Sequence, residues 1–171
     1  MDAETAPDDT EYSFATWYKA QYPGLVHTLV LAIGNVDVAT EAASEAFARA
    51  LQHWGRVSLM RSPTGWTYTV ALNIARRTLR RTRLEALLLR RRATAPPVRE
   101  DSLEVWDAVQ RLPLRQRTAV ALHYLSDLPQ REVAAVMGIA EGTVAATLSE
   151  ARRHLAAMLG QSDPKEKIER G

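Results

Sequence analysis

Residues 112–155 read LPLRQRTAVALHYLSDLPQREVAAVMGIAEGTVAATLSEARRHL and carry the clearest structural pattern in this chain of 171 residues. The apolar spacing predicts two helices, over residues 130–137 and 143–159, with Gly138 in the short turn between them. Two helices joined by a three- or four-residue turn that contains glycine form a helix-turn-helix. The same spacing also fits a plain helical hairpin, so the turn alone does not establish DNA binding.

The residue types in this segment favour the helix-turn-helix. Ala134 is small enough for the second helix to cross closely over the first, and Gly138 supplies a positive φ. Ile139, Val144 and Leu148 are apolar where the second helix packs inward. In a DNA-binding helix-turn-helix the start of the second helix enters the major groove. The positions expected to face outward there are Glu141, Gly142, Thr143, Ala145, Ala146, Thr147, Ser149 and Glu150.

The first half of the chain is also predicted to be helical, because its apolar residues recur every three or four positions. No useful stretch alternates with a period of two, so we predict an all-α protein. Pro23-Gly24 is expected to break the first helix, and Ser62 to cap the fourth, which runs from Pro63 into an arginine block. The expected elements are helices over 12–22, 25–33 and 37–54, the last with Asp37 as N-cap, and a loop over 55–61.

Residues 93–101, ATAPPVRED, form the best domain boundary, because two adjacent prolines cannot continue a helix. We therefore predict two small helical domains, 12–92 and 102–160, joined by a flexible linker. Ser102 is expected to cap the first helix of the second domain, and a further helix is expected over 114–125. The acidic tail 1–11 is predicted to be disordered and the charged tail 161–171 to be frayed.

The net charge of +2 is unevenly distributed along the chain. Residues 1–75 hold four basic and eight acidic side chains, and residues 93–171 hold ten basic and eleven acidic ones. Residues 76–92, in contrast, hold eight arginines and one glutamate. Such a basic block is typical of a phosphate-binding surface or of a solvated helix face.

The sequence lacks the residues or patterns of disulfides, metal sites, phosphate loops, signal peptides and membrane spans. The chain has no cysteine, which removes disulfides and thiol chemistry and fits a reducing compartment. Its four histidines are scattered, without the spacing of a metal site, and it has no glycine-rich phosphate loop. We therefore expect neither a catalytic centre nor a cofactor or metal. The acidic N-terminus is unlike a signal peptide, and no apolar run approaches the length of a membrane span.

Both halves of the chain resemble segments of one known protein family. Residues 112–155 resemble domain four of the extracytoplasmic-function sigma factors of bacterial RNA polymerase, group 4 of the sigma-70 family. FATWYKAQYPGLVHTLVLAIGNVDVATEAASEAFARALQHW, residues 14–54, resembles their regions 2.1 and 2.2. GWTYTVALNIARRTLRR, residues 65–81, resembles their regions 2.3 and 2.4. The matching segments follow the family's order.

The resemblance implies a cytoplasmic, non-enzymatic sigma factor. It would dock on the β′ and β subunits of core polymerase, recognise the −10 and −35 promoter elements, and stabilise the melted DNA strand. An anti-sigma factor is a further partner that the family implies. The implied polymerase-binding residues are Glu41, Ser44, Glu45, Phe47 and Arg49. The implied −10 residues are Trp66, Tyr68, Asn73, Arg76, Arg77, Arg80 and Arg81. The implied −35 residues are Arg115, Arg117, Thr143, Ala146, Thr147, Glu150, Arg152 and Arg153.

The recognition helix departs from the family pattern. Three cations that the family usually has in this helix are absent, and Glu150 stands in place of one of them. Since each lost phosphate contact weakens binding, we predict weak, polymerase-dependent binding to the −35 element. Two alternatives stay open. One is a degenerate sigma-like protein that binds a partner without initiating, and the other is a helix-turn-helix regulator that acts without polymerase.

Overall fold

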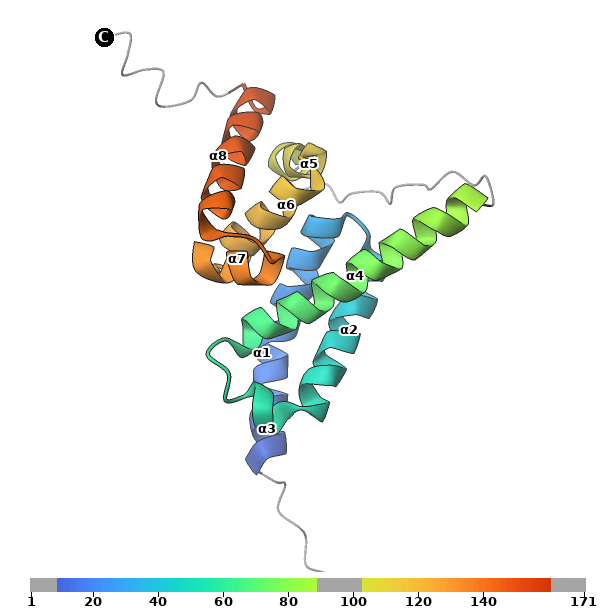
Figure 1. Ribbon diagram of the computed structural model, residues 1–171, viewed down its shortest axis with the longest axis vertical. Helices are drawn as coiled ribbons and strands as arrows, with labels where there is room; N and C mark the ends of the chain where they lie inside the picture. Colours follow the sequence, from blue (N-terminus) through green and yellow to red (C-terminus); the bar gives the residue numbers. More distant parts are fainter. Residues whose placement is uncertain (1–8, 89–102, 161–171) are drawn as a thin grey trace, which may run out of the picture.

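The computed structural model describes residues 9–88 and 103–160 and contains no strand within these ranges (Figure 1). The all-α prediction is therefore confirmed. The first half comprises α1 (Asp9–Ile33), α2 (Val36–Gln52), α3 (Trp54–Val57) and α4 (Pro63–Leu88). The second half comprises α5 (Leu103–Arg111), α6 (Leu114–Val120), the π-helical turn η1 (Ala121–Leu125), α7 (Gln130–Met137) and α8 (Glu141–Met158). The expected linker, the Ser102 cap and most of both expected tails lie outside the described residues.

Helix α1 differs from the prediction, because it runs without interruption past Pro23. A proline inside a helix removes one hydrogen bond and costs about 3 kcal/mol. Buried side chains on both sides of Pro23 offset that cost: Phe14 lies before it, and Leu25 and Leu29 lie after it. Burying one such side chain contributes about 1.5–3 kcal/mol, so tertiary packing outweighs the local preference. The helix also begins at Asp9, inside the tail that was predicted to be disordered.

The ends of the next helices are capped by residues of the expected kinds. Gly34 has a φ of +74° and follows the end of α1, as predicted. Asn35, rather than the predicted Asp37, caps α2, since its Oδ1 accepts a hydrogen bond from Val38 N at 2.9 Å. Ser62 caps α4 as predicted, with its Oγ accepting from Gly65 N at 3.1 Å. The expected loop 55–61 contains most of the short helix α3.

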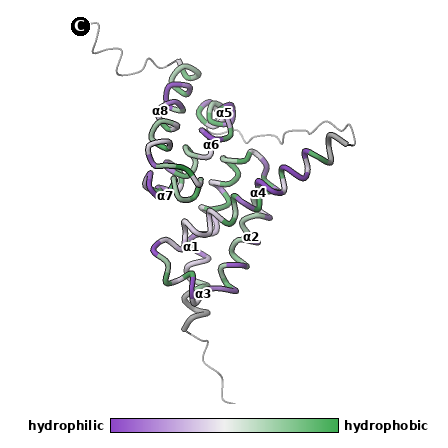
Figure 2. The backbone as a smooth tube through the Cα atoms, in the orientation of Figure 1, coloured by the Kyte–Doolittle hydropathy of each residue, from purple (hydrophilic) through white to green (hydrophobic). Residues whose placement is uncertain are grey.

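A single hydrophobic cluster joins the two halves of the chain. In the first half its centre is aromatic: the rings of Trp17 and Trp54 lie 4.8 Å apart, and those of Tyr18 and Phe47 lie 5.1 Å apart. Helices α1, α2 and α4 pack together, while α5, α6 and η1 lie against α1, α7 lies against α4, and α8 packs on α6 and α7 (Figures 1 and 2). The two sequence segments that were predicted as separate domains are thus packed against each other in this structure.

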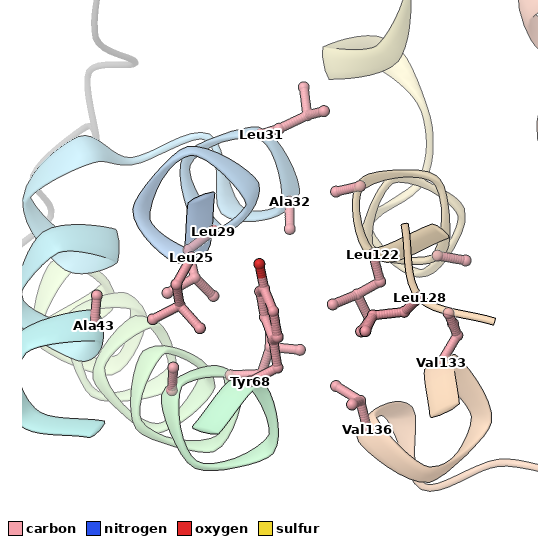
Figure 3. Packing of buried hydrophobic residues seen from close by; sticks show 14 of the residues in the cluster. Leu25, Leu29, Leu31, Ala32, Ala43, Tyr68, Leu122, Leu128, Val133 and Val136 are labelled. Carbon is pink, nitrogen blue, oxygen red and sulfur yellow. The ribbon is translucent and has the colours of Figure 1, made fainter. Parts of the chain in front are cut away.

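Three hydroxyl groups meet at the centre of the contact between the halves. Tyr68 of α4 is only 3% exposed, and its ring lies between leucines of α1 and apolar residues of the second half (Figure 3). Ser126 Oγ donates to Tyr68 Oη at 2.8 Å and lies 2.7 Å from Thr28 Oγ1. Tyr68 Oη lies 3.4 Å from Thr28 Oγ1, which closes the ring. Each buried hydroxyl therefore has a partner from another element.

Arg117 of α6 makes the second polar connection between the halves. Its Nε donates to the carbonyl oxygen of Ala32 at 2.8 Å, and its Nη2 donates to that of Ile33 at 3.4 Å. Its Nη1 donates to the carbonyl oxygen of Gln110 at 2.7 Å. The last carbonyl groups of a helix lack partners within the helix, and a cation there is favourable. Desolvation lowers the pKa of Arg117, and these contacts offset the electrostatic cost of its burial.

The substitution Tyr68→Phe tests the hydroxyl ring. It removes one hydroxyl from a buried network while keeping the aromatic ring, so we expect the free energy of unfolding to fall by about 1 kcal/mol. Tyr124→Phe is the matched control, because that hydroxyl is exposed and accepts only from Arg152. The control should change stability by less than about 0.5 kcal/mol in the same urea titration. Equal losses in the two variants would contradict the network.

The substitution Arg117→Met tests the connection to the end of α1. Methionine keeps much of the side-chain length, but it leaves the carbonyl groups of Ala32 and Gln110 without this donor. Hydrogen bonds to charged groups are worth about 1.5–3 kcal/mol each, so we expect a loss of about 2 kcal/mol or more in urea unfolding. Arg115→Met on the same helix is the control, since Arg115 is exposed. A loss no larger than that of the control would refute this role for Arg117.

Candidate nucleic-acid interface

Exposed basic residues form a stripe along α4. Asn73, Arg76, Arg77 and Arg80 are all exposed, and their spacing of three, four and seven positions places them on one face of the helix. Arg81 is also exposed. The outer part of α4 extends beyond the other helices and carries recurring hydrophilic residues (Figures 1 and 2). We call Asn73, Arg76, Arg77 and Arg80 the α4 stripe.

The two aromatic residues that were predicted with this stripe are less exposed than its arginines. Tyr68 is buried in the hydroxyl ring between the halves, and Trp66 is partly buried against the hydrophobic cluster. Tyr68 is therefore not presented with the arginines, whereas Trp66 is partly exposed and lies seven positions before Asn73, on the same face of α4. In this arrangement the start of α4 contacts α7, and Ser62 Oγ donates to Glu132 Oε2 at 2.8 Å. The second half of the chain therefore covers Tyr68, which the sequence predicted as a −10 contact.

Helices α7 and α8 form the predicted helix-turn-helix. Their axes turn by 101°, which is within the range of this motif. Gly138 has a φ of +68°, and Ile139 N donates to the carbonyl oxygen of Ala134 at 3.0 Å. Val144 and Leu148 are fully buried on the inner side of α8. These observations confirm the turn and the inward face that the sequence predicts.

The outer side of α8 borders a hollow of about 340 Å³ against the start of α6. The hollow is lined by Arg115 and Gln116 of α6 and by Thr143, Ala146, Thr147 and Glu150 of α8, among others. Four predicted −35 residues of α8 and Arg115 are thus brought together. Thr147 is nevertheless buried, and its hydroxyl donates to the carbonyl oxygen of Thr143 at 2.7 Å. Arg152 and Arg153 are exposed one turn further along.

Gln116 was not predicted as a site residue, although it lies at this surface. It is 7% exposed, its Nε2 donates to Glu150 Oε2 at 3.3 Å, and its Oε1 lies 2.8 Å from His154 Nδ1. Gln116 is spaced with the buried Ala119 and Val120 at three and four positions, and this spacing could have placed it on the inward face of α6. Arg117, its neighbour, is held at the end of α1 and is not part of the hollow.

The predicted polymerase-binding residues divide into exposed and buried ones. Glu41, Ser44, Glu45 and Arg49 are exposed on α2, and Arg49 Nε donates to Glu45 Oε1 at 2.8 Å. Phe47 is only 2% exposed and packs against aromatic rings of α1. It therefore supports the core beneath this face and is not presented to a partner.

Neither a metal site nor a single spanning helix is found in the part of the chain that the structure describes. Within residues 9–88 and 103–160, no three His, Asp or Glu side chains gather as metal ligands. In the same ranges no single helix is long and apolar enough to cross a membrane, and only the bent pair α7 and α8 would satisfy length and composition together.

Comparison with known proteins gives matches in both sequence and structure. The family pattern described as Sigma-70, region 4 matches residues 102–155. The chain is 27% identical over 142 residues to the ECF RNA polymerase sigma factor SigW of Bacillus subtilis, covering 72% of this chain and 76% of SigW. It is 26% identical over 160 residues to the ECF RNA polymerase sigma factor SigM of Mycobacterium tuberculosis, covering 87% of this chain and 78% of SigM.

A longer relative is matched over only part of its length. The uncharacterized protein R00370 of Rhizobium meliloti is 31% identical over 152 residues, and the match spans 79% of this chain but 36% of that protein.

Two solved structures share the fold. The sigma factor RpoE of Bartonella quintana, solved in complex with the anti-sigma factor NepR, aligns with a TM-score of 0.75 at 20% identity, covering 88% of this chain and 99% of that one. CnrH, solved in complex with the cytosolic domain of CnrY, aligns with a TM-score of 0.62 at 18% identity, covering 88% and 89% of the two chains. The region 4 match and the two curated relatives show that the chain is similar in sequence to extracytoplasmic-function sigma factors of the sigma-70 family, and the two structures show that it has the same fold.

Proposed function

We propose that this protein directs bacterial core RNA polymerase to promoters, with the α4 stripe at the −10 element and α8 at the −35 element. One observation carries the proposal: a single chain presents both an exposed basic helix face and a helix-turn-helix that matches sigma-70 region 4. A regulator that acts without polymerase would need only the second of these. As a family of transcription initiation factors, sigma factors perform no bond chemistry, and we infer that this one acts in the cytoplasm.

The proposed mechanism is differential binding. Exposed Glu41, Ser44 and Glu45 on α2 would contact the polymerase β′ subunit. The arginines of the α4 stripe would bind phosphates of the melted strand, and each contact releases counterions. Asn73, which is exposed on the same stripe, can both donate to and accept from a base edge through its amide.

We further propose that the two halves separate when the protein binds promoter DNA. Tyr68 and Arg117 are expected DNA contacts, yet both are occupied between the halves. They can reach DNA only when the ring with Ser126 opens and α6 leaves the end of α1. In this proposal, residues 12–92 and 102–160 are the two units that move apart. An anti-sigma factor is a further proposed partner, by analogy with the complexes of the two structural relatives.

Run-off transcription tests the function. Holoenzyme reconstituted from core polymerase and the full chain should select sequences from a randomised duplex pool and transcribe from them. The double variant Arg76→Ala/Arg77→Ala should lose at least tenfold of this transcription while still binding core polymerase, because two phosphate contacts are removed. Lys19→Ala/Arg56→Ala is the control, since it removes two exposed cations from the same half but outside the predicted sites. Equal activity of the two double variants would argue against the α4 stripe.

Binding of the selected duplex without polymerase tests the weakness of the recognition helix. The outer face of α8 has lost cations relative to its family, so the free full chain should bind the duplex weakly at physiological salt. Addition of core polymerase should increase the affinity by at least 100-fold in a fluorescence anisotropy titration. Tight, sequence-specific binding by the free chain would contradict both the weak recognition helix and the need for polymerase.

A further inference from the structure

The buried amide of Gln116 fixes the position of an acidic side chain on the recognition helix. Its two polar atoms contact Glu150 and His154, which lie four positions apart on one face of α8. Because Gln116 is only 7% exposed, its amide must be paired within the protein. The amide thus joins α6 to α8 at the wall of the hollow.

The chemistry of the partners determines which way this amide points. A carboxylate only accepts hydrogen bonds, so the amino group of Gln116 faces Glu150, and its carbonyl oxygen accepts from the Nδ1 proton of His154. The reverse orientation would place two acceptors against each other. Glu150 is therefore held through Oε2, while its second carboxylate oxygen can accept from a ligand.

The surroundings of Glu150 favour a base over a phosphate as that ligand. Glu150 is exposed and lines the hollow together with Thr143 and Ala146, on the face of the helix-turn-helix that enters the major groove. A carboxylate repels phosphates, and it can approach DNA closely only where a donor is offered. Cytosine presents an N4 amino donor in the major groove, whereas guanine and thymine present oxygen acceptors. Adenine pairs its N6 donor with the N7 acceptor, which would repel the carboxylate.

We propose that Glu150, positioned by Gln116, selects a cytosine in the −35 element by accepting a hydrogen bond from its N4 amino group. This inference rests on the proposed function, because it concerns the DNA that the holoenzyme binds. Gln116 is a positioning residue, and Glu150 is the residue that contacts the base.

The test compares the sequences that wild-type and variant holoenzymes enrich from the same randomised duplex pool. Wild type should enrich cytosine at one −35 position by about fivefold over the other bases. Glu150→Gln should shift that position towards adenine, because glutamine pairs with adenine N6 and N7, and it should leave other positions unchanged. Glu104→Gln on α5 is the control, since it removes the same charge from another exposed site. Unchanged base preference in Glu150→Gln, with affinity raised uniformly, would overturn the proposal and assign Glu150 only a repulsive charge.

The variant Gln116→Met tests the positioning role. It should reduce the cytosine enrichment at that one position, and Gln116→Met/Glu150→Gln should behave as Glu150→Gln alone. Urea unfolding of each variant separates this effect from a loss of fold, which would weaken selection at every position. Full cytosine enrichment in a folded Gln116→Met would refute the role of Gln116. If the wild-type holoenzyme enriches no sequence, the proposed function itself fails; enrichment of a −35 element without cytosine refutes only this inference.

Discussion

The contact between the two halves depends on the mutual pairing of buried and partly buried polar groups. Thr28, Tyr68 and Ser126 pair with one another, and Arg117 pairs with the last carbonyl groups of α1. An unpaired buried donor or acceptor costs about 1–3 kcal/mol, so a small displacement of one half would leave several such groups without partners. Apolar burial is non-directional and by itself specifies this placement less sharply. The polar contacts therefore define how the second half sits on α1 and α4, and no buried polar side-chain atom in the described residues lacks a partner.

This constraint divides the expected DNA contacts into two classes. Tyr68 and Arg117 are used to hold the halves together, so contact with DNA competes directly with closure of the molecule. The α4 stripe and Arg152 remain exposed in the closed arrangement. In the proposed complex, long-range attraction to phosphates is thus retained when the halves are packed, whereas the contact proposed for Tyr68 is withheld. The proposed opening would be driven by a partner or ligand that binds the separated halves more strongly than the packed ones.

Features that depend on local periodicity, such as helices and turns, could be predicted from the sequence. Features that depend on contacts between distant residues could not. The helix-turn-helix could be predicted because Gly138, Val144 and Leu148 lie within one short segment. The uninterrupted α1 could not, since the burial that offsets Pro23 comes from contacts with other helices. The contact of Arg117 with the end of α1 could not be predicted either, because its partner is the carbonyl oxygen of Ala32, 85 positions earlier. An arginine beside a helix-turn-helix has the same local pattern whether it binds a phosphate or the end of another helix.

The charge distribution separates affinity from specificity in the proposed complex. Phosphate contacts supply most of the affinity for DNA, and base contacts supply the discrimination between sequences. The α4 stripe concentrates cations on one helix, whereas the exposed surface of α8 carries Glu141 and Glu150 and no arginine before Arg152. A recognition helix of this kind gains little from non-specific DNA, because its carboxylates are repelled by the backbone. Its contribution to binding would appear only when polymerase and α4 already hold the promoter. The −35 contact would then discriminate between sequences, and the other parts of the holoenzyme would supply the affinity.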